Sequence, residues 1–157
     1  MAQFQELHVW IPSNRTYKDG RPKAMDGLNE IIHDNRAHRN KGARMERENV
    51  EWCAWYILQA MRQQQWAPMQ TTDRAAPVRV FITFVEVDER RDVSNVIGGG
   101  LKYALDALSR PRGGKVGASA IYDDSSKWLT RLVPSIRVDP LKPGIDITVV
   151  REIQEDW

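Results

Sequence analysis

The residues of this chain best suited to chemistry are carboxylates near its middle. The segment 89–108, ERRDVSNVIGGGLKYALDAL, follows a hydrophobic stretch and contains Asp92; an acidic pair, Asp123 and Asp124, comes after one short connection. Carboxylates at the ends of adjacent elements are a common way to bind Mg²⁺. A bound cation can activate water and stabilise charge on a phosphoryl oxygen. We therefore expect Asp92 and Asp124 to share one divalent metal ion, although spacing alone does not separate such a site from solvated carboxylates.

Other polar residues of the same segment would support this site. Lys102 can neutralise developing negative charge, and Asp106 lies four residues later, where a salt bridge to Lys102 is its simpler role. Ser94 and Asn95 are both good N-cap residues for the helix that follows. The glycine run 98–100 disfavours a helix and would bend its first turn or keep it loop-like. It lacks the GK[ST] of a P-loop and the spacing of a dinucleotide fingerprint, so we expect no nucleotide cofactor.

Hydrophobic periodicity predicts the elements that must position these residues. We expect strands at 6–11, 77–87, 118–122, 129–138 and 145–152, main helices at 44–65 and from Ser94 or Asn95 to Ser109, and a short helix at 28–33. The strand 77–87 is largely apolar on both faces, which places it centrally in a sheet covered by helices. Turn residues between the last two strands favour a hairpin. The prediction is a single α+β domain over residues 1–157, with a mixed sheet of about five strands and two main helices.

Three basic segments are candidates for contact with phosphates. Residues 36–47 carry five positive side chains against Glu46 alone, a net charge of +4. Phosphate contacts dominate nucleic-acid affinity and need only such cations. The loops 15–23 and 110–117 are also basic, and a solvated charged face is the alternative for residues 15–23 and 36–47. The candidate DNA-binding residues are Arg15, Arg36, Arg39, Lys41, Arg44, Arg110 and Lys115.

Composition bounds the class of protein. With 157 residues, 41% apolar and 28% charged, the chain is typical of one globular domain, and its net charge of +2 excludes no partner. The single cysteine, Cys53, cannot form an internal disulfide, which favours a reducing, cytoplasmic setting. Residues 1–11 lack a signal-peptide pattern, and no apolar run approaches the roughly 20 residues of a membrane span. Trp52, Trp55 and Tyr56 either widen the core surface of the helix 44–65 or pack against a second subunit.

The order of four short motifs resembles the RusA family of Holliday-junction resolvases. These motifs are VWIPSN at 9–14, RRDVSN at 90–95, Lys102 with Asp106-Ala107-Leu108, and Asp123-Asp124. The family pattern reads D-x-D-N, a lysine, D-A-L and a later D-D or N-D, with one strand before it and two after it. The resemblance covers most of the chain but is loose over residues 16–75.

The resemblance implies roles for individual residues. The catalytic positions match Asp92, Lys102 and Asp124, with Asn95 and Asp106 in support and Asp123 as the weaker ligand of its pair. Lys102 matches only if extra residues are allowed at 96–100. Ser94 replaces the second family aspartate, and its neutral hydroxyl is a weaker metal ligand or only a cap. Either the metal site works with fewer negative charges, or Glu86, Asp88 or Asp123 supplies the missing carboxylate, or catalysis is impaired.

The same resemblance implies a function. RusA-like proteins are small α+β homodimers that use Mg²⁺ or Mn²⁺, place two active sites across a four-way DNA junction and nick two strands symmetrically. We therefore expect a metal-dependent endonuclease that resolves Holliday junctions or other branched DNA, in recombination, repair or phage replication, encoded by a host or a prophage. The first alternative is a catalytically impaired protein that binds branched DNA. The second is an interaction protein whose acidic residues are structural.

Overall fold

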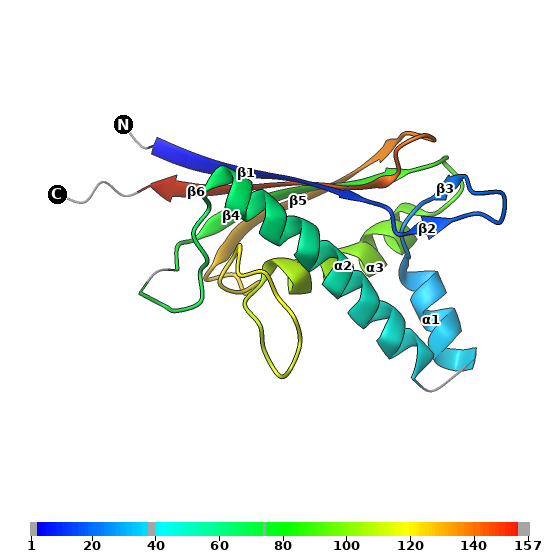
Figure 1. Ribbon diagram of the computed structural model, residues 1–157, viewed down its shortest axis with the longest axis horizontal. Coiled ribbons are helices and arrows are strands. Elements are labelled where there is room, and N and C mark those ends of the chain that lie inside the picture. The colour runs from blue at the N-terminus through cyan, green and yellow to red at the C-terminus, as the bar shows by residue number, and fades with distance from the viewer. Residues whose placement is uncertain (1–2, 38–39, 74, 154–157) are drawn as a thin grey trace.

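The computed structural model describes residues 3–37, 40–73 and 75–153 and has the predicted α+β class. The elements are β1 (Gln3–Pro12), β2 (Arg15–Thr16), β3 (Pro22–Lys23), α1 (Leu28–Ala37), α2 (Lys41–Gln64), β4 (Val78–Glu86), α3 (Val93–Leu108), β5 (Leu129–Val138) and β6 (Gly144–Ile153). Within these residues, four strands form a sheet in the order β1-β6-β4-β5, and β2 pairs with β3 apart from it. The described helices lie on one side of the sheet (Figure 1): α2 contacts β1, α3 contacts β4 and β5, and α1 packs on α2 and α3.

The pairing of β4 with β5 decides where the loops around α3 lie. β6 is antiparallel to both β1 and β4, whereas β4 and β5 are parallel. Parallel strands require a crossover connection, and α3 supplies it. Glu86 at the end of β4 lies beside Val138 at the end of β5, and Val78 at the start of β4 lies beside Leu129. The loop that enters α3 and the loop that leaves it are therefore at opposite ends of the sheet.

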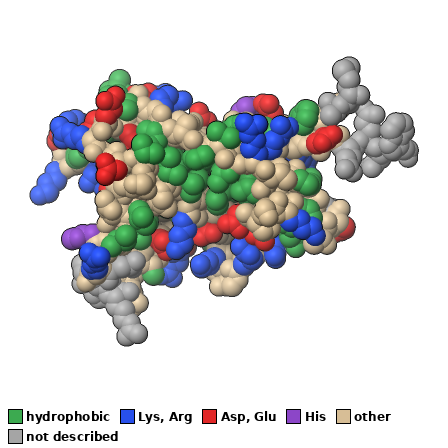
Figure 2. Space-filling view, turned by 180° about the vertical axis from the view of Figure 1, so that it is seen from behind, with side chains coloured by type: hydrophobic (Ala, Val, Ile, Leu, Met, Phe, Trp, Pro, Cys, Tyr) green, Lys and Arg blue, Asp and Glu red, His purple; other side chains and the backbone are tan. Residues whose placement is uncertain are grey.

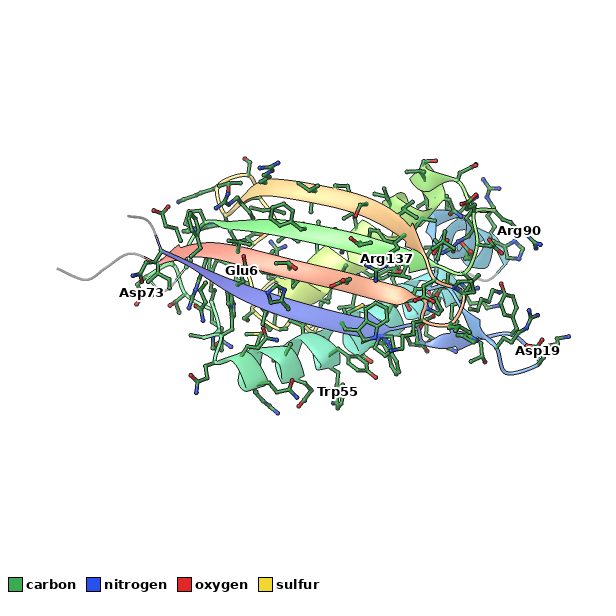
Figure 3. The ribbon with its side chains drawn as sticks, turned by 90° about the horizontal axis from the view of Figure 1, so that it is seen from above. Glu6, Asp19, Trp55, Asp73, Arg90 and Arg137 are labelled. Carbon is green, nitrogen blue, oxygen red and sulfur yellow. The ribbon has the colours of Figure 1, made fainter. Side chains whose placement is uncertain are left out.

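Alternation along the strands buries the face of the sheet that the helices cover. In β1, Leu7, Val9 and Ile11 are buried while the residues between them are exposed. The prediction that β4 is a central strand is confirmed, because β6 and β5 flank it. The described helices cover only one face, however, and Figure 3 looks onto the other, which carries Arg79 and Thr83 of β4.

The glycines of α3 permit close packing rather than a bend. A Cβ atom on Gly100 would lie 2.8 Å from Cδ1 of Phe84 and closer still to the next ring atom. One on Gly99 would overlap the backbone of Gly27 and Leu28 at the start of α1. The expectation of a bent or loop-like first turn is wrong, because these glycines let a regular helix lie directly on β4 and on α1.

The expected strand 118–122 is absent from the described structure, so the sheet has four strands rather than five. This segment instead hydrogen-bonds to the last turn of α3. The Ala118 N–H donates to the Ala107 carbonyl at 2.8 Å, and the Ile121 N–H donates to the Leu108 carbonyl at 3.0 Å. The segment is thus tied to the C-terminal end of the helix.

The expected hairpin between the last two strands is also wrong. β4 lies between β5 and β6, so the connection 139–143 passes over the end of β4. There the Asp139 N–H donates to the Glu86 carbonyl at 2.8 Å. The expected short helix at 28–33 extends to Ala37. Over the described ranges, no helix combines the length and the apolar composition needed to cross a membrane.

Candidate functional site

Asp92 is the N-cap residue of α3 and follows the C-terminal end of β4. Its carbonyl accepts hydrogen bonds from the N–H groups of Asn95 at 3.0 Å and Val96 at 3.1 Å, which begins the helix. Its side chain makes no capping hydrogen bond and is exposed. The sequence analysis predicted Ser94 or Asn95 as the N-cap, two or three residues too late. Asp92 therefore presents a carboxylate that is open to a ligand.

Asp124 lies at the other end of the same helix. The Arg110 N–H donates to the Tyr122 carbonyl at 3.4 Å, which holds the segment before Asp124 beside the end of α3. A helix of 16 residues is about 24 Å long at 1.5 Å per residue. The prediction that Asp92 and Asp124 of one chain share a cation is wrong, because the length of α3 lies between them. Ligands of one Mg²⁺ lie only about 2.0–2.1 Å from it.

Lys102 is near neither aspartate. It is ten residues after Asp92, about 15 Å along the helix axis, and its ammonium group lies 3.2 Å from Glu46 of α2. Asp106 lines a pocket of about 340 Å³ between α2 and the loop that carries Lys115. The extra residues at 96–100 are helical and add about one turn. They therefore carry Lys102 away from the position that the resemblance implies.

The pair Asp123 and Asp124 has a perturbed electrostatic environment. Partial burial, and then a hydrogen bond with Asp123, raises the pKa of Asp124. The Arg112 guanidinium opposes this, at 3.3 Å from Asp123 and 4.0 Å from Asp124. The guanidinium of Arg110 lies over the ring of Tyr122 at 4.5 Å. Adjacent carboxylates repel each other when both are ionised, and a bound cation would reduce this repulsion.

Neither Ser94 nor Asn95 is the N-cap of α3, which is Asp92. Ser94 is the second residue of α3 and is exposed, so it is not the N-cap. Asn95 is buried, and its Oδ1 accepts a hydrogen bond of 2.6 Å from the Asn29 N–H in the first turn of α1. The asparagine therefore joins the starts of two helices, which is an orienting role rather than a ligand role.

Arg91, beside Asp92, forms a charge network that the sequence prediction missed. It makes two hydrogen bonds of 2.7 Å to Glu86, one of 2.8 Å to Glu30 and one of 2.8 Å to the Met25 carbonyl. Burial alone would lower the pKa of Arg91, but the bonds to Glu86 and Glu30 outweigh it and raise the pKa. Glu86 therefore holds Arg91 in place and is not available as a compensating metal ligand.

The network continues into the N-terminal part of the chain. Arg15 lies 3.1 Å from Asp26 and donates to the Ala24 carbonyl at 3.0 Å. Asn49 of α2 donates to the other oxygen of Asp26 at 2.9 Å. Arg15 was predicted to bind DNA, but its guanidinium is held in this network. The one sequence feature that pointed to this charge network was Glu86, which continues the buried face of β4. Its partners are far apart in the sequence, so local patterns could not connect them.

The remaining basic candidates fall into two groups. Arg36, Lys41 and Arg44 are exposed near the α1–α2 connection, and the latter two line a pocket of about 400 Å³ beside Asp26. Arg39 lies outside the described residues. Arg110 and Lys115 are at the far end of α3, near Asp123 and Asp124. The basic segment 36–47 and the loop 110–117 nevertheless approach each other, because Arg47 of α2 and Lys115 line one pocket.

Within residues 3–37, 40–73 and 75–153, no three histidine, cysteine, aspartate or glutamate residues are grouped so that they could hold one ion. Asp88 and Asp123 therefore do not form such a group of three with Asp92. The chain matches no protein-family model, and a search of curated protein sequences finds no significant match. The relation to RusA-like resolvases thus remains a prediction from the motifs.

Proposed function

We propose that this protein is a metal-dependent, structure-specific DNA endonuclease with a RusA-like fold that resolves four-way junctions or other branched DNA. The order of the motifs around α3 carries this proposal: Asp92 before the helix and Asp123-Asp124 after it, in a parallel β-α-β arrangement. Basic side chains flank the second acidic site, as expected for a protein that approaches phosphates. Action in recombination, repair or phage replication is part of the same proposal.

The separation of Asp92 from Asp124 sets a condition on this function. Because one chain holds them at opposite ends of α3, both can act on one Mg²⁺ or Mn²⁺ only if they come from two chains. In a two-fold dimer the same surface meets itself in reverse, so the start of one α3 can lie beside the end of the other. A homodimer would then have two equivalent sites, as symmetric cutting of two strands requires.

A cleavage assay on a synthetic four-way junction tests the activity. We expect symmetric cutting with Mg²⁺ or Mn²⁺ and none with EDTA, and we expect Asp92→Asn and Asp124→Asn to abolish cutting while junction binding persists. Asp19→Asn, an exposed aspartate on the β2–β3 turn, is the matched control and should cut normally. Cleavage that survives in Asp92→Asn would remove this residue from the site.

Mixing the two inactive variants tests whether the site is shared between chains. In a dimer of one Asp92→Asn chain with one Asp124→Asn chain, one shared site loses both aspartates and the other keeps both. Co-expressed, differently tagged copies should therefore nick one strand of the junction, although each variant alone is inactive. A mixed dimer that stays inactive would show that each chain uses its own aspartates.

The basic residues at the start of α2 provide a separate test of DNA binding. Replacing Lys41 and Arg44 together by glutamine should weaken junction binding and flatten its salt dependence, because each phosphate contact releases counterions. Replacing the exposed Arg62 and Lys142 together by glutamine removes the same two charges elsewhere and is the control for a change in net charge. Equal affinity of the Lys41, Arg44 variant and the parent protein at low salt would show that these charges form a solvated face.

A second candidate is a protein of the same fold that binds branched DNA without cutting it. Ser94 favours this candidate, because it stands where the resemblance expects a carboxylate. The hydroxyl also projects from the second residue of a helix rather than from an extended loop beside Asp92. Junction binding that is equal with Mg²⁺, Mn²⁺ and EDTA, together with no cutting at any metal concentration, would establish it.

A further inference from the structure

A pocket of about 550 Å³ lies on the side of α2 that faces away from the core. The core side of this helix is separate, since it carries Val50, Ala54 and Ile57. The pocket residues of α2 recur three and four positions apart, which places them on one face of the helix. None of the lining residues belongs to the candidate metal site or to the predicted DNA contacts. They are Asn14, Glu48, Glu51, Trp52, Trp55 and Tyr56.

Three aromatic rings form one wall of this pocket. The ring centroid of Tyr56 lies 5.2 Å from that of Trp52 and 4.9 Å from that of Trp55. The Trp52 Nε1–H donates to the Pro12 carbonyl at 2.7 Å, which fixes the orientation of that indole. Trp55 is 57% exposed, and Figure 3 shows it on α2 at the side of the molecule away from β5. The wall is therefore formed in the free chain and still presents an indole to a ligand.

The charges at this pocket are negative. Glu48 and Glu51 are exposed, and they are the only charged residues among those described that line it. Arg44 and Arg47 lie one helical turn before them, yet neither carboxylate makes an ion pair with another described residue. Carboxylates repel the phosphates of nucleic acid, so these rings are poorly placed to stack on its bases. Aromatic faces and carboxylates both attract cations.

An arginine side chain fits this combination better than other cations. Its planar guanidinium can stack on an aromatic ring and give two hydrogen bonds to one carboxylate. The chain already contains both contacts: the guanidinium of Arg110 lies 4.5 Å from the ring centre of Tyr122, and that of Arg91 gives two hydrogen bonds to Glu86. A small free ligand needs a pocket that buries most of its surface. An exposed wall such as that of Trp55 suits a side chain that a larger partner holds in place.

The opposite side of the molecule has an apolar surface as well. Figure 2, which views the molecule from behind, shows hydrophobic side chains gathered across its middle, with charged side chains of both signs around them. That mixture of charges selects no one kind of partner. The pocket on α2 combines aromatic rings with charges of one sign, so it selects a cationic partner by charge complementarity.

We propose that the pocket on α2 binds an arginine side chain in an exposed segment of a protein partner, with the guanidinium stacked on Trp55 and paired with Glu51. Glu51 lies four residues before Trp55, so both side chains can reach one guanidinium. Glu48 and Trp52 have the same spacing one turn earlier. This binding goes beyond the proposed nuclease function. Its test uses neither DNA nor metal, so the two proposals can fail independently.

Binding of an arginine peptide tests this site. The probe is a short amidated peptide of alternating arginine and glycine with a fluorescent label, and its anisotropy is measured as protein is added. We expect saturable binding to the parent protein. The same peptide with lysine in place of arginine should bind about 3-fold more weakly or worse, because an ammonium group neither stacks nor pairs through two parallel hydrogen bonds. A peptide with citrulline, which keeps the shape of arginine without its charge, should not bind.

Variants locate the binding on the protein. Trp55→Ala should weaken binding of the arginine peptide about 3- to 30-fold, the range of a cation–π contact, and Glu51→Gln should also weaken it. Both residues are exposed, so both variants should keep the Tm of the parent protein. Trp10→Ala and Glu6→Gln are the matched controls. They alter an exposed indole and an exposed carboxylate of β1 that do not line the pocket, and they should bind the peptide as the parent does.

Two results with these peptides would overturn the proposal. The first is equal binding of the arginine and lysine peptides, or no saturable binding of the arginine peptide at millimolar protein. The second is a loss of affinity in Trp10→Ala and Glu6→Gln as large as that in the pocket variants, since the attraction would then be spread over the surface.

Three further measurements separate the other possible occupants, and each named result would also overturn the proposal. A labelled oligothymidylate that binds more tightly than the arginine peptide, and does so only with Trp55 intact, would assign the pocket to single-stranded DNA. Tetramethylammonium that displaces the labelled peptide at a lower concentration than unlabelled arginine peptide would assign it to a small cation. A parent dimer that Trp55→Ala dissociates in sedimentation velocity would assign it to a second copy of the chain.

Discussion

The packing of α3 on β4 predicts opposite effects for two neighbouring glycine-to-alanine substitutions. Gly98 and Gly100 belong to the same helix, and alanine is favoured over glycine in a helix interior by about 1 kcal/mol. Any difference between the two variants must therefore come from what the new methyl group meets. This makes Gly98→Ala a matched control for Gly100→Ala.

The surroundings of the two glycines differ sharply. At Gly98, which is exposed, the nearest atom to a new Cβ is Cδ2 of Leu28 at 3.4 Å, an ordinary contact. At Gly100 the new atom would lie 2.8 Å from Cδ1 and 2.9 Å from Cζ of Phe84. Phe84 is buried within the core, so its ring cannot turn aside without displacing other side chains. Overpacking of this kind costs about 1–3 kcal/mol and occasionally more.

The effect of each variant is the sum of the helix preference of alanine and the cost of overpacking. Gly98→Ala should raise the free energy of unfolding by about 0.5–1 kcal/mol. Gly100→Ala should range from neutral to a loss of about 2 kcal/mol, because the packing cost opposes the same helix gain. The variants should therefore differ by about 1–3 kcal/mol, or roughly 2–12 °C in Tm for a chain of this size.

Urea denaturation followed by tryptophan fluorescence measures both free energies. The comparison should be made at one protein concentration, because the proposed dimerisation would add a concentration-dependent contribution to the free energy of unfolding. Equal stability of Gly98→Ala and Gly100→Ala would refute the reasoning, since α3 would not then lie in contact with β4 at Gly100. Greater stability of Gly100→Ala would refute it more strongly.

Three further outcomes follow from single contacts. Arg91→Leu should lower the free energy of unfolding by about 3 kcal/mol, because it leaves buried carboxylates without their partner. Arg90→Leu alters a side chain that is 89% exposed and should change this free energy little. Equal losses for the two variants in urea denaturation would contradict the charge network around Arg91. Gln65→Gly should raise thermal stability by about 0.5–1 kcal/mol, because Gln65 ends α2 with a φ of 57° that glycine adopts without strain; a lower Tm would contradict this. Burial raises the pKa of Cys53 to about 12, so at pH 9 the thiol stays protonated in the folded protein. The thiol ionises and reacts only when the protein unfolds. Labelling by an excess of a thiol reagent should therefore be no faster than unfolding.

The sequence predicted the strands and helices whose apolar residues repeat regularly. β1, β4, α2 and α3 were found because one face of each is buried, and burial leaves a period in the sequence. The centre of the sheet was also foreseen, since β4 is apolar on both faces. The charge network around Arg91 was not, because its partners Glu30 and Glu86 come from elements that local patterns do not connect.

The error at the candidate site has one source. A strand at 118–122 that ran parallel to β4 would have ended near Asp92 and carried Asp124 with it. In the structure this segment is irregular and tied to the end of α3, and β5 is the strand that runs parallel to β4. Asp124 therefore precedes the parallel strand instead of following it. Because residues 118–122 were wrongly predicted to be a strand, Asp124 was expected at the wrong end of the sheet.

The residues of α3 divide by face in a way that connects its packing to the proposed activity. Glycine and alanine let the helix lie close to the sheet, Lys102 joins it to α2, and Ile97, Leu101 and Leu105 pack, partly buried, against the core. The same helix holds its two acidic ends too far apart for one cation. In the proposed homodimer, two α3 helices that meet antiparallel would bring Asp92 of one chain toward Asp124 of the other, as a shared cation site requires.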